Sequence, residues 1–256
     1  MATYTRDDGA AVTLSDLTAG YGSHAAIHHL NGSFAQGSLT AIVGPNGSGK
    51  STLLKTIAGL LAPMGGRCRR QAGQTLAYLP QLSELDRGFP ARVRDLVALG
   101  LWQRRGLLGR HRMGDRDRVS TALEQVGLQD FDHRPLDTMS GGQLQRAMFA
   151  RVLVQDAPLI LLDEPFNAID DKTIRDLTGL IARWHVEGRT VLTVAHDLAL
   201  VRAHFPQTLL LARRAVALGP TAEVLTEANI ARARSFQEAW DEAAPWCAPQ
   251  GAWRAA

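Results

Sequence analysis

The chain has 256 residues, of which 45% are hydrophobic and 21% are charged, a composition that excludes a disordered protein. The length suits one large domain, or a core with a modest insertion. The formal net charge of +3 rests mainly on scattered arginines, since lysine occurs only as Lys50, Lys55 and Lys172. Without a long basic stripe or interleaved aromatic residues, we expect no nucleic-acid binding.

Two features of the chain bear on its compartment. Cys68 and Cys247 stand alone without CxxC spacing, which favours a reducing compartment over a disulfide scaffold. The N-terminus has no apolar stretch of the secretory type, and no apolar run approaches membrane-spanning length. We therefore expect a soluble cytosolic protein that serves a membrane only through partners.

The N-terminal part has strand patterns around one aromatic residue. Residues 12–17 alternate like an edge strand, and residues 27–37 indicate a second strand and a turn. Tyr21, between two glycines, either caps the core or offers a flat face to an adenine ring. His28 and His29 have no third ligand at a suitable spacing, so we interpret them as surface histidines.

A glycine-rich segment lies between a predicted strand at 39–43 and a predicted helix at 52–58. It fits the phosphate-loop pattern G-x-x-x-x-G-K-S/T in the strand–loop–helix context that the pattern requires. Glycines let successive N–H groups turn toward an anion, and the helix start adds partial positive charge. We expect Lys50 to reach the β- and γ-phosphates and Ser51 to ligate Mg²⁺. The predicted phosphate site comprises Gly44, Pro45, Asn46, Gly47, Ser48, Gly49, Lys50, Ser51 and Thr52.

The middle of the chain changes to helical patterns. After a turn-rich break at 59–66, a strand is predicted at 75–79, just before Gln81. Apolar residues then fall on single helical faces on both sides of a basic turn at 104–112. Those residues are Val93, Leu96, Val97 and Leu101, then Val119, Leu123 and Val126. We predict a helical insertion over residues 82–150 in an α/β core.

The next helix begins with two adjacent glycines. Ser140 and Gln143 have the spacing of a capping box, which by itself indicates only a well-capped helix. Gly141 and Gly142 each cost that helix about 1 kcal/mol relative to alanine. They are explained if another group approaches the backbone closely, because a helix N-terminus without side-chain bulk can bind an anion.

Acidic residues follow a buried strand. The apolar run at 159–162 is typical of a parallel strand, and it ends in Asp163 and Glu164. Open α/β sheets bind their ligands at the carboxyl ends of strands. We expect Asp163 to hold Mg²⁺ and Glu164 to orient or deprotonate a water molecule. His196 follows a strand predicted at 190–195 and is expected at the same edge.

The rest of the chain continues the α/β pattern. Strands at 209–211 and 215–218 are predicted to form a hairpin, followed by a helical region at about 221–240. The end of the chain has no periodicity, and we expect residues 236–256 to be a loose tail. An amphipathic helix precedes these elements, with apolar positions Ile174, Leu177, Ile181 and Trp184.

The motifs in this order resemble the ATP-binding cassette (ABC) family over residues 12–229. One position departs from the family pattern, since Met139 stands where leucine is usual. The resemblance implies a P-loop NTPase core, RecA-like with an antiparallel β subdomain, at 1–81 and 151–235, and the insertion is then the helical subdomain. The matching residues are Tyr21 (A-loop), 44–51 (Walker A), Gln81 (Q-loop), 140–143 (signature), 159–164 (Walker B), Asp170 (D-loop) and His196 (switch histidine).

The resemblance also implies a mechanism. Two copies would pair head to tail as a homodimer, with each ATP between Walker A of one copy and the signature of the other. Glu164, His196 and Gln81 would be catalytic, and Ser51, Gln81 and Asp163 would hold the Mg²⁺ of Mg-ATP. Tyr21, Asp170 and the signature residues would contact the nucleotide. The partners would be membrane permease subunits and, indirectly, an extracytoplasmic substrate-binding protein, which places the chain on the cytoplasmic face of the membrane.

The cargo and the rival functions remain open at this point. Residues 93–100, 104–110 and 126–128 look like those of zinc- and manganese-type importers, although iron-chelate and haem importers have similar insertions. We expect a divalent metal, with zinc first. A soluble ABC ATPase outside transport is one rival, although such proteins usually have tandem cassettes or a long coiled coil. A nucleotide kinase is the other, and it would not need the signature or His196.

Overall fold

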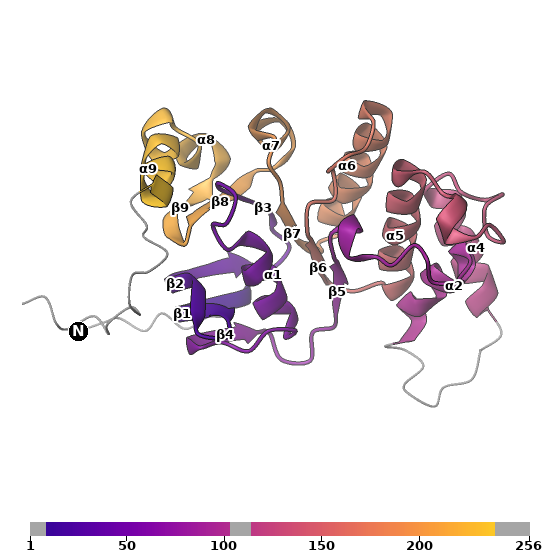
Figure 1. Ribbon diagram of the computed structural model, residues 1–256, viewed down its shortest axis with the longest axis horizontal. Helices are drawn as coiled ribbons and strands as arrows, with labels where there is room; N and C mark the ends of the chain where they lie inside the picture. The colour runs from indigo at the N-terminus through magenta and orange to yellow at the C-terminus, as the bar shows by residue number, and fades with distance from the viewer. Residues whose placement is uncertain (1–8, 103–113, 239–256) are drawn as a thin grey trace, which may run out of the picture.

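The computed structural model describes residues 9–102 and 114–238, which form two sheets and a group of helices at one end (Figure 1). The basic turn predicted at 104–112 and residues 239–256 of the predicted tail lie outside the described residues. No helix within the described ranges is long and apolar enough to cross a membrane.

The smaller sheet is antiparallel, with strand order β2-β1-β4. It consists of β1 (Ala10–Tyr21), β2 (His24–Ala35) and β4 (Gly65–Arg70). The predicted edge position of the first strand is wrong, because β1 pairs on both sides; its alternation reflects one solvent-facing side of the sheet. The strand β4 was not predicted, because its arginine-rich sequence lacks apolar alternation and its order comes from pairing with β1.

The larger sheet has six strands in the order β5-β6-β7-β3-β8-β9, all parallel except the last hairpin strand. All the predicted strands of this sheet and the hairpin are confirmed. The strands are β3 (Leu39–Val43), β5 (Leu76–Leu79), β6 (Leu159–Leu162), β7 (Thr190–Val194), β8 (Gln207–Ala212) and β9 (Arg214–Pro220).

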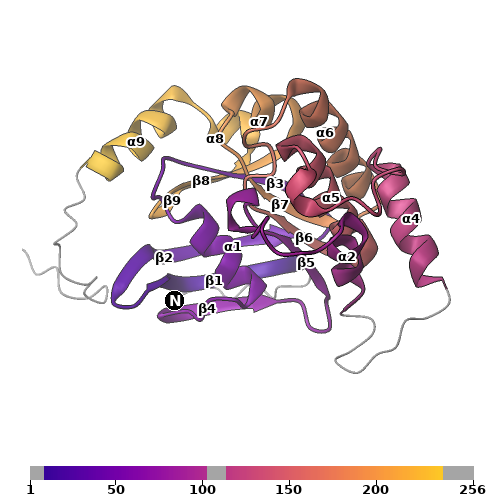
Figure 2. The same ribbon diagram turned by 45° about the vertical axis from the view of Figure 1, so that its right-hand side comes forward.

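Two hydrophobic clusters cover the two faces of the large sheet. Successive residues of β6 alternate between them, as the two-residue period of a strand requires. One cluster joins that sheet, the small sheet and α1 (Lys50–Ala58), so α1 is held between the two sheets (Figure 2). The other lies under α5 (Gly141–Gln155), α6 (Asp171–Val186), α7 (Leu198–His204), α8 (Thr221–Val224) and α9 (Glu227–Glu238).

The predicted helical insertion contains α2 (Val93–Ala98) and α4 (Asp115–Gln125), both packed on α5. All seven apolar positions predicted for it are buried, as the helical spacing requires. The helix α5 continues past residue 150 and carries Phe149, whose ring stacks on Trp184 at 5.8 Å. The division into subdomains therefore stays a prediction, with its second boundary inside a continuous helix.

Two smaller predictions are corrected by the structure. The single helical region expected at 221–240 is two helices, because the chain leaves helical geometry at Leu225. His28 is not a surface histidine, since only 5% of it is exposed and its backbone N–H donates to the Arg213 carbonyl at 2.7 Å. Burial lowers the pKa of His28. His29 beside it is partly buried and contacts the Asp16 carboxylate at 2.8 Å.

Candidate functional site

The loop between β3 and α1 is shaped by glycines with positive φ at Gly44, Gly47 and Gly49. A Cβ on Gly44 would lie 1.9 Å from the Leu211 carbonyl oxygen, and one on Gly49 would lie 2.7 Å from Ile27. Neither position leaves room for a side chain. Nothing lies within 4 Å of a Cβ on Gly47, so the middle of the loop is open. The backbone there is accessible to a ligand.

Lys50 opens α1 and turns back over this loop. Its ammonium donates to the carbonyl oxygens of Gly44 at 3.0 Å and Pro45 at 2.9 Å. Burial lowers the pKa of Lys50, and the nearby carboxylates of Glu164 and Asp163 oppose that shift. A cation is therefore held where the loop faces the carboxyl edge of the large sheet.

A polar corner connects α1 with the ends of β5 and β6. The Ser51 hydroxyl donates to one oxygen of the Asp163 carboxylate at 2.9 Å, and the Gln81 amide donates to the Ser51 hydroxyl at 3.1 Å. The Tyr78 hydroxyl donates to the other Asp163 oxygen at 3.3 Å. Asp163 is fully buried, and this burial raises its pKa despite these hydrogen bonds. The corner unites three predicted residues with Tyr78, which the sequence pattern did not single out.

A carboxylate–imidazole pair lies at the ends of the next strands. Glu164 follows β6 and His196 follows β7, and the Glu164 Oε1 to His196 Nε2 distance is 2.7 Å. The Asn167 amide donates to the other Glu164 oxygen at 3.3 Å. Glu164 has φ of 51°, a left-handed conformation that is rare outside glycine and concentrated at functional sites. Glu164 and His196 thus lie together at one edge of the sheet, as the sequence predicted.

The predicted capping box at the start of α5 is confirmed. The Ser140 hydroxyl accepts from the Gln143 N–H at 3.2 Å, and the Gln143 side chain accepts from the Ser140 N–H at 3.0 Å. A Cβ on Gly142 would lie 3.3 Å from the Asp170 carboxylate. One group that approaches the glycines closely is thus Asp170 of the same chain, while the nearest atom to a Cβ on Gly141 is 3.7 Å away.

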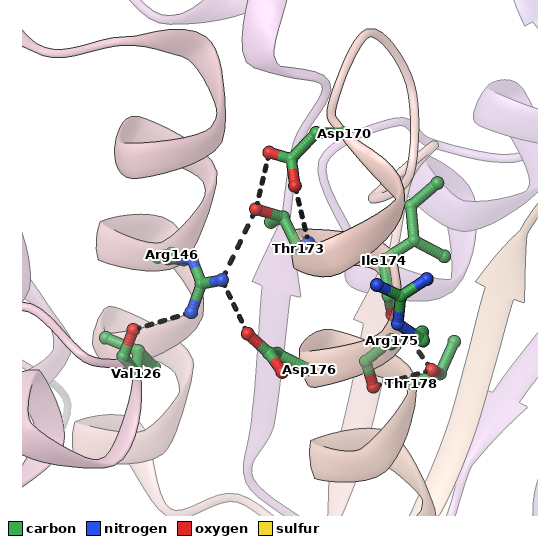
Figure 3. A network of polar contacts seen from close by, with 8 residues as sticks. All are labelled: Val126, Arg146, Asp170, Thr173, Ile174, Arg175, Asp176 and Thr178. Atoms are coloured by element: carbon green, nitrogen blue, oxygen red, sulfur yellow. Dashed lines mark hydrogen bonds and ion pairs between the residues drawn. The ribbon is translucent and has the colours of Figure 1, made fainter.

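Figure 3 shows how Asp170 is tied to α5. It accepts from the Thr173 N–H at 2.9 Å and the Thr173 hydroxyl at 2.8 Å, which lowers its pKa. The Arg146 guanidinium donates to Thr173 at 3.3 Å, to Asp176 at 2.6 Å and to the Val126 carbonyl at 3.0 Å. Arg146 was missed because a single arginine within an amphipathic helix carries no distinctive pattern.

The predicted residues form two groups rather than one. The loop, the polar corner and the carboxylate–imidazole pair lie together at the edge of the large sheet. The start of α5 lies with Asp170, and α1 and α5 are apart in both views (Figures 1 and 2). Tyr21 ends β1 with 53% of its surface exposed, which excludes the core-capping interpretation. The chain therefore has two separate candidate surfaces, the glycine loop at the sheet edge and the glycine-bearing start of α5.

Comparisons with known proteins identify what the chain is similar to. The family model described as ABC transporter matches residues 27–167. A manganese transport system ATP-binding protein of Synechocystis sp. is 38% identical over 231 residues, 87% of this chain and 86% of that protein. A zinc transport system ATP-binding protein of Treponema pallidum is 38% identical over 229 residues, again 87% of this chain and 86% of that protein.

Solved structures give the same fold. A chain from an ABC transporter described as of the metal-chelate type, in an inward-facing conformation, superposes with a TM-score of 0.79 at 28% identity, covering 88% of this chain and 89% of that one. A bacterial ABC transporter cassette solved as a dimer superposes with a TM-score of 0.73 at 26% identity, covering 82% of this chain and 98% of that one. The predicted P-loop NTPase fold class is confirmed.

Proposed function

Because this chain belongs to the ABC transporter family and is an ATP-hydrolysing subunit, we propose that it powers the uptake of a divalent metal ion, zinc or manganese. The support for this cargo is the set of curated relatives at 37–40% identity, which are named as metal, manganese or zinc transport proteins. An iron-chelate or haem importer is the alternative, and it is favoured by the likeness to a solved metal-chelate type transporter, at 28% identity against 37–40% for the relatives named for metal ions.

One observation carries the hydrolytic part of the proposal. Lys50, Ser51, Asp163, Glu164 and His196 converge at the carboxyl ends of β3, β6 and β7, where open α/β sheets bind ligands. The open backbone at the loop's middle suits the phosphates of ATP, and the exposed Tyr21 suits its base. A kinase would transfer phosphate to an acceptor, whereas we assign Glu164 to the activation of water. Release of free phosphate would distinguish the two.

The polar corner fits Mg²⁺. Magnesium prefers oxygen ligands, and the corner supplies the Ser51 hydroxyl, the Asp163 carboxylate and the carbonyl of the Gln81 side chain. A carboxylate with its pKa raised by burial is stabilised in its ionised form by a nearby divalent cation. When bound, Mg²⁺ supplies positive charge against the phosphate oxygens.

Glu164 and His196 perform the step with water. The free lone pairs of Glu164 orient a water molecule and accept its proton, the role of a general base. His196, at 2.7 Å, and Asn167, at 3.3 Å, fix the direction of the carboxylate. The Lys50 ammonium, now on two carbonyl oxygens, is placed to move to phosphate oxygens with more negative charge. These four side chains thus divide the work: Lys50 binds phosphate, His196 and Asn167 orient the carboxylate, and Glu164 accepts the proton.

A single copy leaves the starts of α1 and α5 apart, so we place the second half of each site in another copy. In a head-to-tail homodimer, the Ser140–Gly142 end of α5 would cap the triphosphate held by the partner's loop. A helix start with free N–H groups and no side-chain bulk suits that contact. ATP would favour the closed pair through contacts that ADP lacks, which turns hydrolysis into motion.

The motion would be used by partners. We place the chain as a peripheral subunit on the cytoplasmic face of a membrane, bound to permease subunits that receive cargo from an extracytoplasmic binding protein. The segment after Gln81 and the predicted helical subdomain would contact the permease. A soluble ABC ATPase outside transport lacks support among relatives named as transport systems.

Metal uptake by cells tests the proposed cargo. Cells that carry the wild-type chain should accumulate radiolabelled zinc or manganese, and cells with the Glu164→Gln chain should not. Equal uptake of both metals by the two strains would reject the metal proposal. Uptake of a labelled iron chelate in their place would establish the alternative.

A further inference from the structure

The segment that follows β5 touches α1 at two places. The Gln81 side-chain amide donates to the Ser51 hydroxyl at 3.1 Å. Further along, the Lys55 ammonium donates to the Glu84 carboxylate at 2.7 Å, the shorter of the two contacts. Neither Lys55 nor Glu84 takes part in the site described above.

Helical periodicity explains why the two contacts align. The segment forms a short 3₁₀ helix, Leu82–Glu84, in which the Glu84 N–H donates to the Gln81 carbonyl at 3.0 Å. Gln81 immediately precedes this helix, and its side chain and that of Glu84, three residues further on, both contact α1. Residues four apart share a face of an α-helix, which puts Ser51 and Lys55 in line on α1. The two contacts therefore lie one beside the other between α1 and the segment that follows β5.

The other side of the segment is apolar. Leu82 and Leu85 are partly buried against the large hydrophobic cluster, and the 3₁₀ helix packs on α5. This packing holds the segment to the helical part of the molecule, but apolar contacts are non-directional and do not fix its rotation toward α1. The directional contacts at 2.7 and 3.1 Å do so.

We propose that Lys55 and Glu84 are a positioning pair, which fixes the Gln81 side chain against Ser51 and so shapes the magnesium-binding corner. The proposal rests on the function given to that corner above. Magnesium demands near-ideal octahedral geometry, so a small displacement of one ligand weakens its binding. Without the contact between Lys55 and Glu84, the Gln81 side chain would sample several orientations, and the preorganisation of the corner would be lost.

The test compares ATP affinity with Mg²⁺ and with EDTA in a Glu164→Gln background, which keeps the nucleotide intact. The variants are Lys55→Met, Glu84→Gln and the two together. Arg183→Met and Glu124→Gln are matched controls that remove one charge from exposed helix positions. Isothermal titration gives each dissociation constant. The dissociation constant in EDTA divided by that with Mg²⁺ isolates the contribution of Mg²⁺ to ATP affinity.

We expect each single variant to reduce this ratio roughly threefold to fivefold, the size that a partly exposed ion pair can supply. Affinity in EDTA should stay unchanged, and the double variant should match the single ones, because both remove the same contact. Single variants equal to the controls, or a double effect equal to the product of the single effects, would overturn the proposal. If Lys55→Met does not fold, Glu84→Gln, which keeps its shape, decides.

The same titration separates this proposal from the one beneath it. If the parent protein binds ATP equally well with Mg²⁺ and with EDTA, the proposed function of the corner fails and the pair has nothing to position. If the parent depends on Mg²⁺ and both single variants keep that dependence, only the positioning role fails.

Discussion

Replacing Glu164 by glutamine tests the catalytic proposal most sharply. The Glu164 carboxylate contacts His196 at 2.7 Å through one oxygen and Asn167 at 3.3 Å through the other. Glutamine has almost the same shape and keeps a carbonyl oxygen for one of these contacts. It loses the negative charge and the ability to accept a proton from water. The substitution therefore removes chemistry and leaves the packing of the edge in place.

The expected loss follows from the role. A positioned general base contributes roughly 10²- to 10⁴-fold to rate, which corresponds to about 3–5 kcal/mol of the barrier. ATP affinity should stay equal or rise, because one carboxylate near the phosphates has been neutralised. Phosphate release at saturating ATP measures the first quantity, and gel filtration with ATP detects an accumulated dimer. Turnover within about threefold of wild type would refute the assignment of Glu164 as the base.

Three further substitutions test the other parts. Lys50→Ala should weaken ATP binding by roughly tenfold to a hundredfold, the worth of hydrogen bonds from a charged donor, and unchanged binding would contradict the phosphate-loop assignment. Ser140→Arg should leave ATP binding to the single copy intact and block dimer formation, so wild-type ATPase activity would reject the shared site. Asp163→Asn should abolish hydrolysis and raise the melting temperature of the nucleotide-free protein. Burial raises the folded-state pKa of Asp163 above 3.8, so ionisation opposes folding as pH rises through that window, and the cost is present at pH 7. A lower melting temperature for this variant would contradict that reasoning.

Local patterns were sufficient for most of the fold. The apolar strands 159–162 and 190–194 and the loop at 44–51 are defined by neighbours in the sequence, and the structure has them where they were expected. The strand β4 was missed because its order depends on pairing with β1, a partner roughly fifty residues away in the chain. The burial of His28 likewise depends on the hairpin at Arg213, which no local pattern reveals.

The site shows the same division. Asp163, Glu164 and His196 could be predicted together because parallel strands end at one edge of a sheet. Tyr78, Arg146 and Glu84 could not be predicted, because their contacts with Asp163, Asp176 and Lys55 join segments that are distant in the sequence. For the two glycines before Gln143, the sequence predicted that another group approaches the backbone closely, but not which group. One of them faces Asp170 in the same chain, and the contact proposed with a second copy needs that copy.

The central claim is that the loop of one copy and the start of α5 of its partner hold one triphosphate between them. A crystal or cryo-EM structure of the Glu164→Gln protein with ATP and magnesium tests it directly. We predict a two-fold dimer in which each γ-phosphate lies between Lys50 of one copy and Ser140 of the other. A nucleotide-bound protein in which these two surfaces point away from each other would contradict the account.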